Sequence, residues 1–98
     1  MTRGQPSDAS ALKLRREGKS FAGIAKTLGY ERASYANDAF NRALRELPSD
    51  EQVIVRDEEN VRLDALESRL RARSDLDVED VERRLRTIGR LRQGLMAK

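Results

Sequence analysis

Apolar residues along this chain recur every three or four positions, which is the spacing of one face of an amphipathic helix. The clearest case is the stretch 20–30, which reads SFAGIAKTLGY. Ser20 can cap a helix by accepting hydrogen bonds from the first turn, and Gly29 can end it in the left-handed conformation. The pattern predicts a helix over residues 20–28, a glycine turn and a second helix. The apolar face comprises Phe21, Ile24, Ala25 and Leu28.

The helical period extends over most of the chain, and no strand-like alternation bounded by turns interrupts it. Pro48 cannot continue a helix, and the polar stretch 74–77 supplies a second break. A short connection between two long helices implies an antiparallel helical hairpin. The sequence therefore predicts an all-α fold, in which a tri-helical N-terminal part precedes a long antiparallel hairpin. The expected helices are 8–18, 20–28, 31–47, 50–71 and 78–96.

Composition excludes several functional classes. Of the 98 residues, 38% are charged and 4% are aromatic, so any core must be thin and mainly aliphatic. Cysteine and histidine are absent, which removes disulfides, thiolate metal sites and the commonest general base. No nucleophile–base pair or metal set is left, so we expect no cofactor, no metal and no enzymatic activity.

Hydropathy and charge indicate where the protein acts and on what. No apolar run approaches the roughly 20 residues that span a bilayer, and the N-terminus lacks the apolar middle of a signal peptide. We therefore expect a cytoplasmic protein with no membrane partner. Residues 1–47 hold nine Lys and Arg against five Asp and Glu, whereas residues 48–73 hold five against seven. This excess of positive charge in the N-terminal part favours a nucleic-acid partner.

Residues 11–47 resemble the tri-helical DNA-binding unit of bacterial and phage regulators. The resemblance rests on the words Leu14-Arg15-x-Glu17-Gly18-x-Ser20-Phe21-x-x-Ile24-Ala25-x-x-Leu28-Gly29-Tyr30, which are similar to short helix-turn-helix proteins of actinobacteria and their phages. It covers somewhat over a third of the chain. It implies a helix-turn-helix DNA-binding domain over 8–47 and a helical hairpin for oligomerisation over 48–98. The turn-like composition of the N-terminal residues predicts a flexible tail over 1–7.

The chain departs from the family pattern just after the turn. The family usually places apolar residues six and nine positions after the turn glycine, and here these are Tyr35 and Asp38. One position later stand Ala36 and Ala39, which suit burial. We therefore expect a turn one residue longer than the shortest versions, with Tyr35 and Asp38 facing outward. We also expect Asp38 to pair with Arg42 at the i, i+4 spacing rather than to contact a base.

In this reading helix 31–47 enters the major groove while helix 20–28 crosses the phosphate backbone. Arginine donates bidentately to guanine and asparagine pairs with adenine, so the polar face of helix 31–47 suits base edges. The basic side chains of helix 8–18 either contact phosphate or form a solvated face. The expected base-reading residues are Arg32, Ser34, Tyr35, Asn37, Asn41 and Arg42. The expected phosphate contacts are Lys19, Ser20, Lys26 and Arg45.

The hairpin over 48–98 is expected to assemble the protein into a homo-dimer or larger oligomer, because one copy makes few contacts with double-stranded DNA. Small subunits of phage terminases look like a helix-turn-helix followed by such a hairpin, and simple repressors likewise add dimerising helices. The expected oligomerisation residues are Ile54, Val61, Leu63, Leu66, Leu70, Val81, Leu85, Ile88 and Leu95.

The resemblance implies a DNA-binding protein of the bacterial nucleoid, either a transcriptional regulator or a nucleoid or phage DNA-recognition factor. Two alternatives stay open. One is a DNA-packaging recognition protein like a terminase small subunit. The other is a helical protein–protein interaction module without DNA binding. Helix 50–71 favours this last alternative, because it carries two apolar strips where a lone surface helix needs one.

Overall fold

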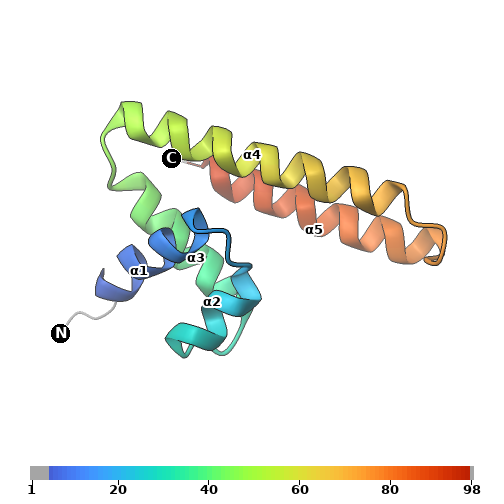
Figure 1. Ribbon diagram of the computed structural model, residues 1–98, viewed down its shortest axis with the longest axis horizontal. Coiled ribbons are helices and arrows are strands. Elements are labelled where there is room, and N and C mark those ends of the chain that lie inside the picture. The colour runs from blue at the N-terminus through green and yellow to red at the C-terminus, as the bar shows by residue number, and fades with distance from the viewer. Residues whose placement is uncertain (1–4, 98) are drawn as a thin grey trace. The chain divides into compact units, whose positions relative to one another are not determined.

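The computed structural model describes residues 5–97, with side chains from Ser7 onward. This part of the chain is all-helical, as predicted, and contains no strand (Figure 1). The first helix begins inside the tail expected over 1–7, and residues 1–4 of that tail lie outside the described range. None of the described helices is long and apolar enough to cross a membrane. The helices are α1 (Gln5–Arg16), α2 (Phe21–Leu28), α3 (Ala33–Arg45), α4 (Ser49–Arg71) and α5 (Val78–Met96).

The chain divides into two compact units, with the boundary after Val55. The first unit holds α1, α2, α3 and the start of α4, and the second holds the rest of α4 together with α5. The first turns of α4 therefore belong with the N-terminal helices, although Pro48 marks the clearest break in the sequence.

The core of the first unit is built around α3, which packs against both α1 and α2. Small residues let the helices approach closely: Ala11 of α1 and Ala36 and Ala39 of α3 are fully buried. Phe40 fills the remaining space and meets Phe21 edge-to-face, with 5.6 Å between the ring centroids. Burial of Ala36 and Ala39 confirms the expected register, in which Tyr35 and Asp38 face outward.

Two glycines reverse the chain between the first three helices. Gly18 follows α1 with φ 101° and Gly29 follows α2 with φ 83°, a region that side-chain-bearing residues rarely adopt. Ser20 caps α2, because its hydroxyl oxygen accepts from the N–H of Gly23 at 3.0 Å. The N–H of Gly29 donates to the Ala25 carbonyl at 2.8 Å and so closes the last turn. The cap and turn expected from the sequence are confirmed.

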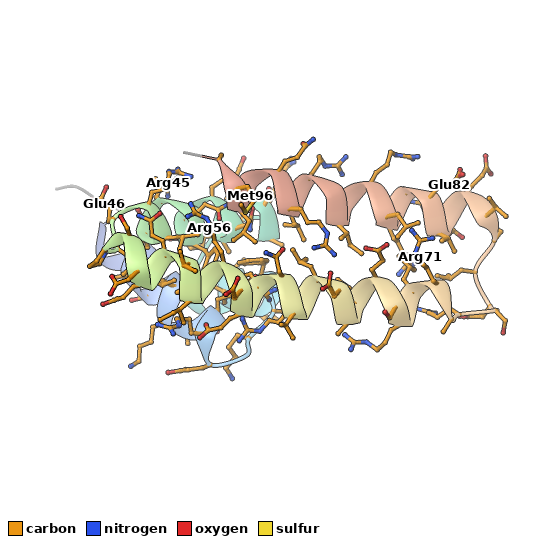
Figure 2. The ribbon with its side chains drawn as sticks, turned by 90° about the horizontal axis from the view of Figure 1, so that it is seen from above. Arg45, Glu46, Arg56, Arg71, Glu82 and Met96 are labelled. Atoms are coloured by element: carbon orange, nitrogen blue, oxygen red, sulfur yellow. The ribbon has the colours of Figure 1, made fainter. Side chains whose placement is uncertain are left out.

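In the second unit α4 and α5 run side by side in opposite directions (Figure 1). Figure 2 agrees: Arg56 and Met96 lie near one end of the pair, whereas Arg71 and Glu82 lie near the turn. Asp77 begins α5 by accepting from the N–H of Asp80 at 2.8 Å. The bounds of α5 match the expected range of 78–96.

Polar side chains join α4 to α5 alongside the apolar contacts. Arg56 donates from Nε to the Leu95 carbonyl at 2.9 Å. Arg92, which interrupts the apolar repeat of α5, reaches across to α4 and ties the two helices together. Its acceptors there are Asn60 (3.2 Å), Asp64 (2.7 Å) and Glu67 (3.3 Å).

The residues expected to mediate oligomerisation fall into three groups. Leu63, Leu70, Ile88 and Leu95 are buried within the single chain, so they are not available to a partner. Val81 and Leu85 are half-buried. Ile54, Val61 and Leu66 remain exposed, at 53%, 68% and 42% respectively.

Candidate nucleic-acid interface

The candidate interface is the outward face of α3 together with the turn that precedes it. Arg32 has extended backbone angles, φ −140° and ψ 151°, and so stands just before the first helical residue. The following positions Ser34 and Tyr35 lie on the first turn, and all three side chains are exposed. Helical spacing places Asp38 and Arg45 on this same face, and both are exposed. The N-terminal half of α3 thus presents a mixed polar and aromatic surface.

Asn41 does not belong to that surface, and its expected role in base reading is wrong. The residue is only 6% exposed, and its Nδ2 donates to Oδ1 of Asn37 at 3.3 Å. Its own Oδ1 is buried with no partner in the part of the chain described. Asn37 is half-buried, which leaves it at the edge of the face rather than on it.

Arg42 is held by α1 instead of pairing with Asp38. Its Nε and Nη2 each donate to a carboxylate oxygen of Asp8 at 3.0 Å, forming a bidentate pair between residues 34 positions apart. The hydrogen bond from Arg42 to Asp8 raises the pKa of Arg42, while partial burial opposes it and the charges of Asp8, Tyr30 and Asp38 add to the rise. The expected i, i+4 pair is therefore wrong, although Asp38 lies near enough to act on Arg42 through its charge.

The pair with Asp8 reduces the number of hydrogen-bond donors that Arg42 can offer to a ligand. The Asp8 side chain is only 13% exposed, whereas the Arg42 side chain is 51% exposed. Both oxygens of the carboxylate engage the Nε–Nη2 edge of the guanidinium, which is one of the two edges that can read guanine bidentately. Nη1 makes no hydrogen bond within the described chain and is left for a ligand. Arg42 thus serves first to join α1 to α3.

The four expected phosphate contacts are all exposed. Lys19 precedes α2, Lys26 lies in its last turn and Arg45 lies in the last turn of α3. Ser20 is the cap of α2, so its oxygen is already an acceptor, while its hydroxyl hydrogen can still be donated. Lys26 also borders a shallow hollow of about 520 Å³ at the turn between α2 and α3.

Arg15 shows a role that the sequence left undecided. Its guanidinium lies over the Phe21 ring, with 4.1 Å between Cζ and the ring centroid. Its Nη1 also donates to the Lys19 carbonyl at 3.0 Å. Arg15 therefore holds the turn between α1 and α2. This contact could not be predicted from the sequence, because Arg15 and Phe21 are six positions apart and belong to different helices. The glycine turn between these helices brings the two side chains together.

No set of described side chains could hold a metal ion through three or more His, Cys, Asp or Glu ligands. What the interface offers to a ligand is hydrogen-bond donors, positive charge and one aromatic ring.

Comparison with family models, with curated protein sequences and with solved structures found nothing that matches this chain.

Proposed function

We propose that this protein binds double-stranded DNA as a homo-dimer or larger oligomer, with α2, its glycine turn and α3 acting as a helix-turn-helix and α4 with α5 as the oligomerisation hairpin. The observation that carries the proposal is the exposed first turn of α3, which follows a capped α2 and a left-handed glycine. In helix-turn-helix docking, the N-terminal residues of the second helix meet base edges while the first helix crosses the backbone.

The reading set in this proposal is smaller than the one expected from sequence. Arg32, Ser34 and Tyr35 contact bases, because they are exposed around the N-terminus of α3. Asn37 contributes from the edge and Arg42 only through Nη1. Asn41 takes no part. The backbone contacts are Lys19, Ser20, Lys26 and Arg45.

The proposed role is a transcriptional regulator, or a nucleoid or phage DNA-recognition factor, working in the bacterial cytoplasm without a cofactor. Recognition of DNA for packaging, as in a terminase small subunit, would use the same interface. Oligomerisation in this proposal depends on the exposed residues Ile54 and Val61 of α4, since Leu63, Leu70, Ile88 and Leu95 are buried within the single chain.

Selection of bound duplexes from random DNA, followed by titration of the selected site, tests the proposal. Arg32→Ala should reduce discrimination between the selected and a scrambled site by about 1–3 kcal/mol if Arg32 meets a base. Lys26→Ala should weaken both sites alike and make the log–log salt slope shallower by about 0.9. Arg86→Ala is the control, because Arg86 is exposed on α5 and lies outside the interface.

Two results would contradict DNA binding. One is the absence of any enriched sequence together with binding that does not depend on salt. The other is an equal effect of Arg32→Ala, Lys26→Ala and Arg86→Ala, because a specific interface cannot treat all three positions alike. In that case the remaining candidate is a helical protein-interaction module, which the exposed apolar residues of α4 favour.

A further inference from the structure

The second unit contains a groove between α4 and α5 that DNA binding does not use. Its volume is about 690 Å³, inside the range of roughly 300–1,000 Å³ typical of binding pockets. The floor is apolar and includes Leu66, Ile88 and Leu91. Leu66 is 42% exposed, a large share for a leucine at the edge of a helix pair. The floor is thus open to an apolar ligand.

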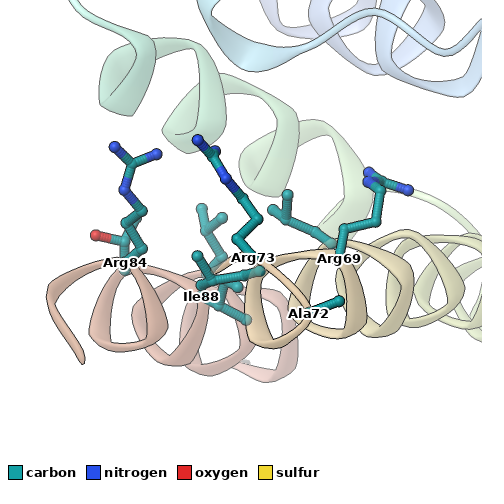
Figure 3. Close-up of a pocket in the computed structure, with 9 residues that line it drawn as sticks. Arg69, Ala72, Arg73, Arg84 and Ile88 are labelled. Carbon is teal, nitrogen blue, oxygen red and sulfur yellow. The ribbon is translucent and has the colours of Figure 1, made fainter. Parts of the chain in front are cut away.

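Three arginines stand along the groove: Arg69 and Arg73 from the α4 side and Arg84 from α5. Their guanidinium groups extend to the same side of the two helices, as Figure 3 shows. Arg69 and Arg84 make no hydrogen bond or ion pair within the described residues, but Arg84 lies near enough to Asp75 to act on it: the hydrogen bond from Arg73 and, to a smaller extent, the charge of Arg84 lower the pKa of Asp75. Arg73 donates to Asp75 at 3.0 Å, and both side chains are well exposed. The groove therefore combines an apolar floor with a positively charged rim.

Asp75 offsets part of the positive charge of the rim, whereas the neighbouring carboxylates of Asp64, Glu67 and Asp80 are engaged elsewhere. Glu67 accepts from Arg71 and Arg92, and Asp64 also accepts from Arg92. Asp80 pairs with Arg83. Asp75 is the one carboxylate paired with a rim arginine in the described chain. A ligand that brings carboxylates of its own would complete the pairing that the chain leaves open.

We propose that this groove binds an acidic amphipathic helix of a partner protein, with the apolar side chains of that helix on Leu66, Ile88 and Leu91 and its carboxylates against Arg69 and Arg84. A helix supplies both features at once, since apolar residues at i, i+3, i+4 and i+7 share one face and acidic residues flank it. Nucleic acid matches the arginines but has a charged backbone with no apolar counterpart for the floor. The proposal goes beyond DNA binding and does not depend on it.

A second copy of this chain is a weaker match to the groove. Its exposed apolar residues on α4 include Ile54 and Val61. Asp64 lies three positions after Val61 and is already paired with Arg92. Docking through Asp64 would therefore have to break an existing ion pair before making a new one.

The test uses the full chain and a library of random peptides about 16 residues long, enough for a helix of roughly 24 Å. The enriched peptides should carry Asp or Glu beside apolar residues at helical spacing. Fluorescence anisotropy with one enriched peptide should then show binding weakened by about tenfold or more in the double variant Arg69→Glu, Arg84→Glu. The matched control is Arg86→Glu, a charge reversal at another exposed arginine of α5 outside the groove, which should keep the wild-type affinity.

Circular dichroism of each variant checks that the helices are retained, since all three arginines are surface residues. Enriched peptides without acidic residues, or an equal loss in Arg86→Glu, would overturn the proposal. So would a nucleic acid whose binding disappears in the double variant while no peptide is enriched. Sedimentation of the same proteins tests whether a second copy occupies the groove. A self-associated state that the double reversal abolishes would assign the groove to a second copy and overturn the proposal.

Discussion

Arg42 illustrates how a side chain that looks suited to DNA reading can have a structural function. Its exposed position on α3 and its charge match a base-reading residue, yet Asp8 engages one edge of its guanidinium from α1. Asn41 shows the opposite case, in which a side chain suited to adenine is buried beside Asn37. Residue type and helical face are therefore insufficient to assign contacts in a small domain, where a polar face is shared between ligand and neighbouring helices.

Arg42→Ala should destabilise the first unit by about 1 kcal/mol, because it leaves the nearly buried Asp8 carboxylate without its donors. The value lies at the low end for charged hydrogen bonds, since solvent screens the half-exposed guanidinium. Urea unfolding of Arg42→Ala, Asp8→Ala and the double variant measures the coupling, and the double variant should lose less than the sum of the two. Strict additivity would show that the pair contributes nothing to stability.

The stability of α2 comes from interactions at its two ends more than from its length. It spans only eight residues, and isolated helices of this size are marginal in water. The Ser20 cap, the Gly29 turn and the contact between Phe21 and Phe40 compensate for this. By contrast, α4 and α5 are long, and Arg92 joins them through three acceptors on α4.

Gly29→Ala should destabilise the protein by about 1–2 kcal/mol, because it forces a side chain into the left-handed conformation that ends α2. Gly89→Ala is a matched control inside α5, where it should stabilise by about 0.5–1 kcal/mol. An added Cβ meets nothing within 4 Å at either position, so backbone conformation alone separates the two. Denaturant unfolding measures both, and equal effects would contradict the role given to Gly29.

Acid should destabilise α4 and, to a smaller extent, its contact with α5 through Glu67. Hydrogen bonds from Arg71 and, to a smaller extent, Arg92 lower the pKa of Glu67, while desolvation opposes them. A lowered folded pKa gives stability that is present above the unfolded value of 4.5 and is lost as the pH falls through the folded value. Melting temperatures of the wild type and Glu67→Gln should therefore differ at neutral pH and converge in acid. If the difference in melting temperature between the wild type and Glu67→Gln stays constant with pH, ionisation of Glu67 is excluded as its cause.

In our proposal the two functions are divided between helices: α2 and α3 read DNA, whereas α4 and α5 provide surfaces for other protein chains. The small size supports this, because a 98-residue chain with few aromatics buries a limited core and leaves apolar residues outside. Ile54 and Val61, which are seven positions apart and share one face of α4, are the most direct candidates for self-association.

The double variant Ile54→Asp, Val61→Asp should shift the protein to monomer in analytical ultracentrifugation and weaken binding to a selected DNA site, because each molecule would then carry one reading unit. Val78→Asp is the control, since Val78 is 72% exposed at the start of α5 and lies away from that face. A wild-type protein that stays monomeric at every concentration, with tight binding to DNA, would contradict the need for two copies.

The sequence by itself determined that the described part of the chain forms five helices, the cap and turn of α2, the bounds of α5 and the register of α3, because these follow from interactions within a few residues. It placed the ends of α1 and α3 less well: α1 spans Gln5–Arg16 instead of 8–18, and α3 spans Ala33–Arg45 instead of 31–47. Serine at a cap, glycine at a left-handed turn and apolar residues at intervals of three and four were sufficient to place α2 and α5 and to predict burial of Ala36 and Ala39.

Only the tertiary structure decided which polar residues stay available to a partner. Asp8 and Arg42 are 34 positions apart, and Arg92 lies 25 to 32 positions from its three acceptors on α4. Such pairs cannot be predicted from spacing along the sequence, because they depend on which helices pack together and on how far one helix is shifted along the other. Packing within the first unit buries Asn41 and engages Arg42, whereas in the second unit the pairing of α4 with α5 leaves Arg69 and Arg84 beside an open apolar groove.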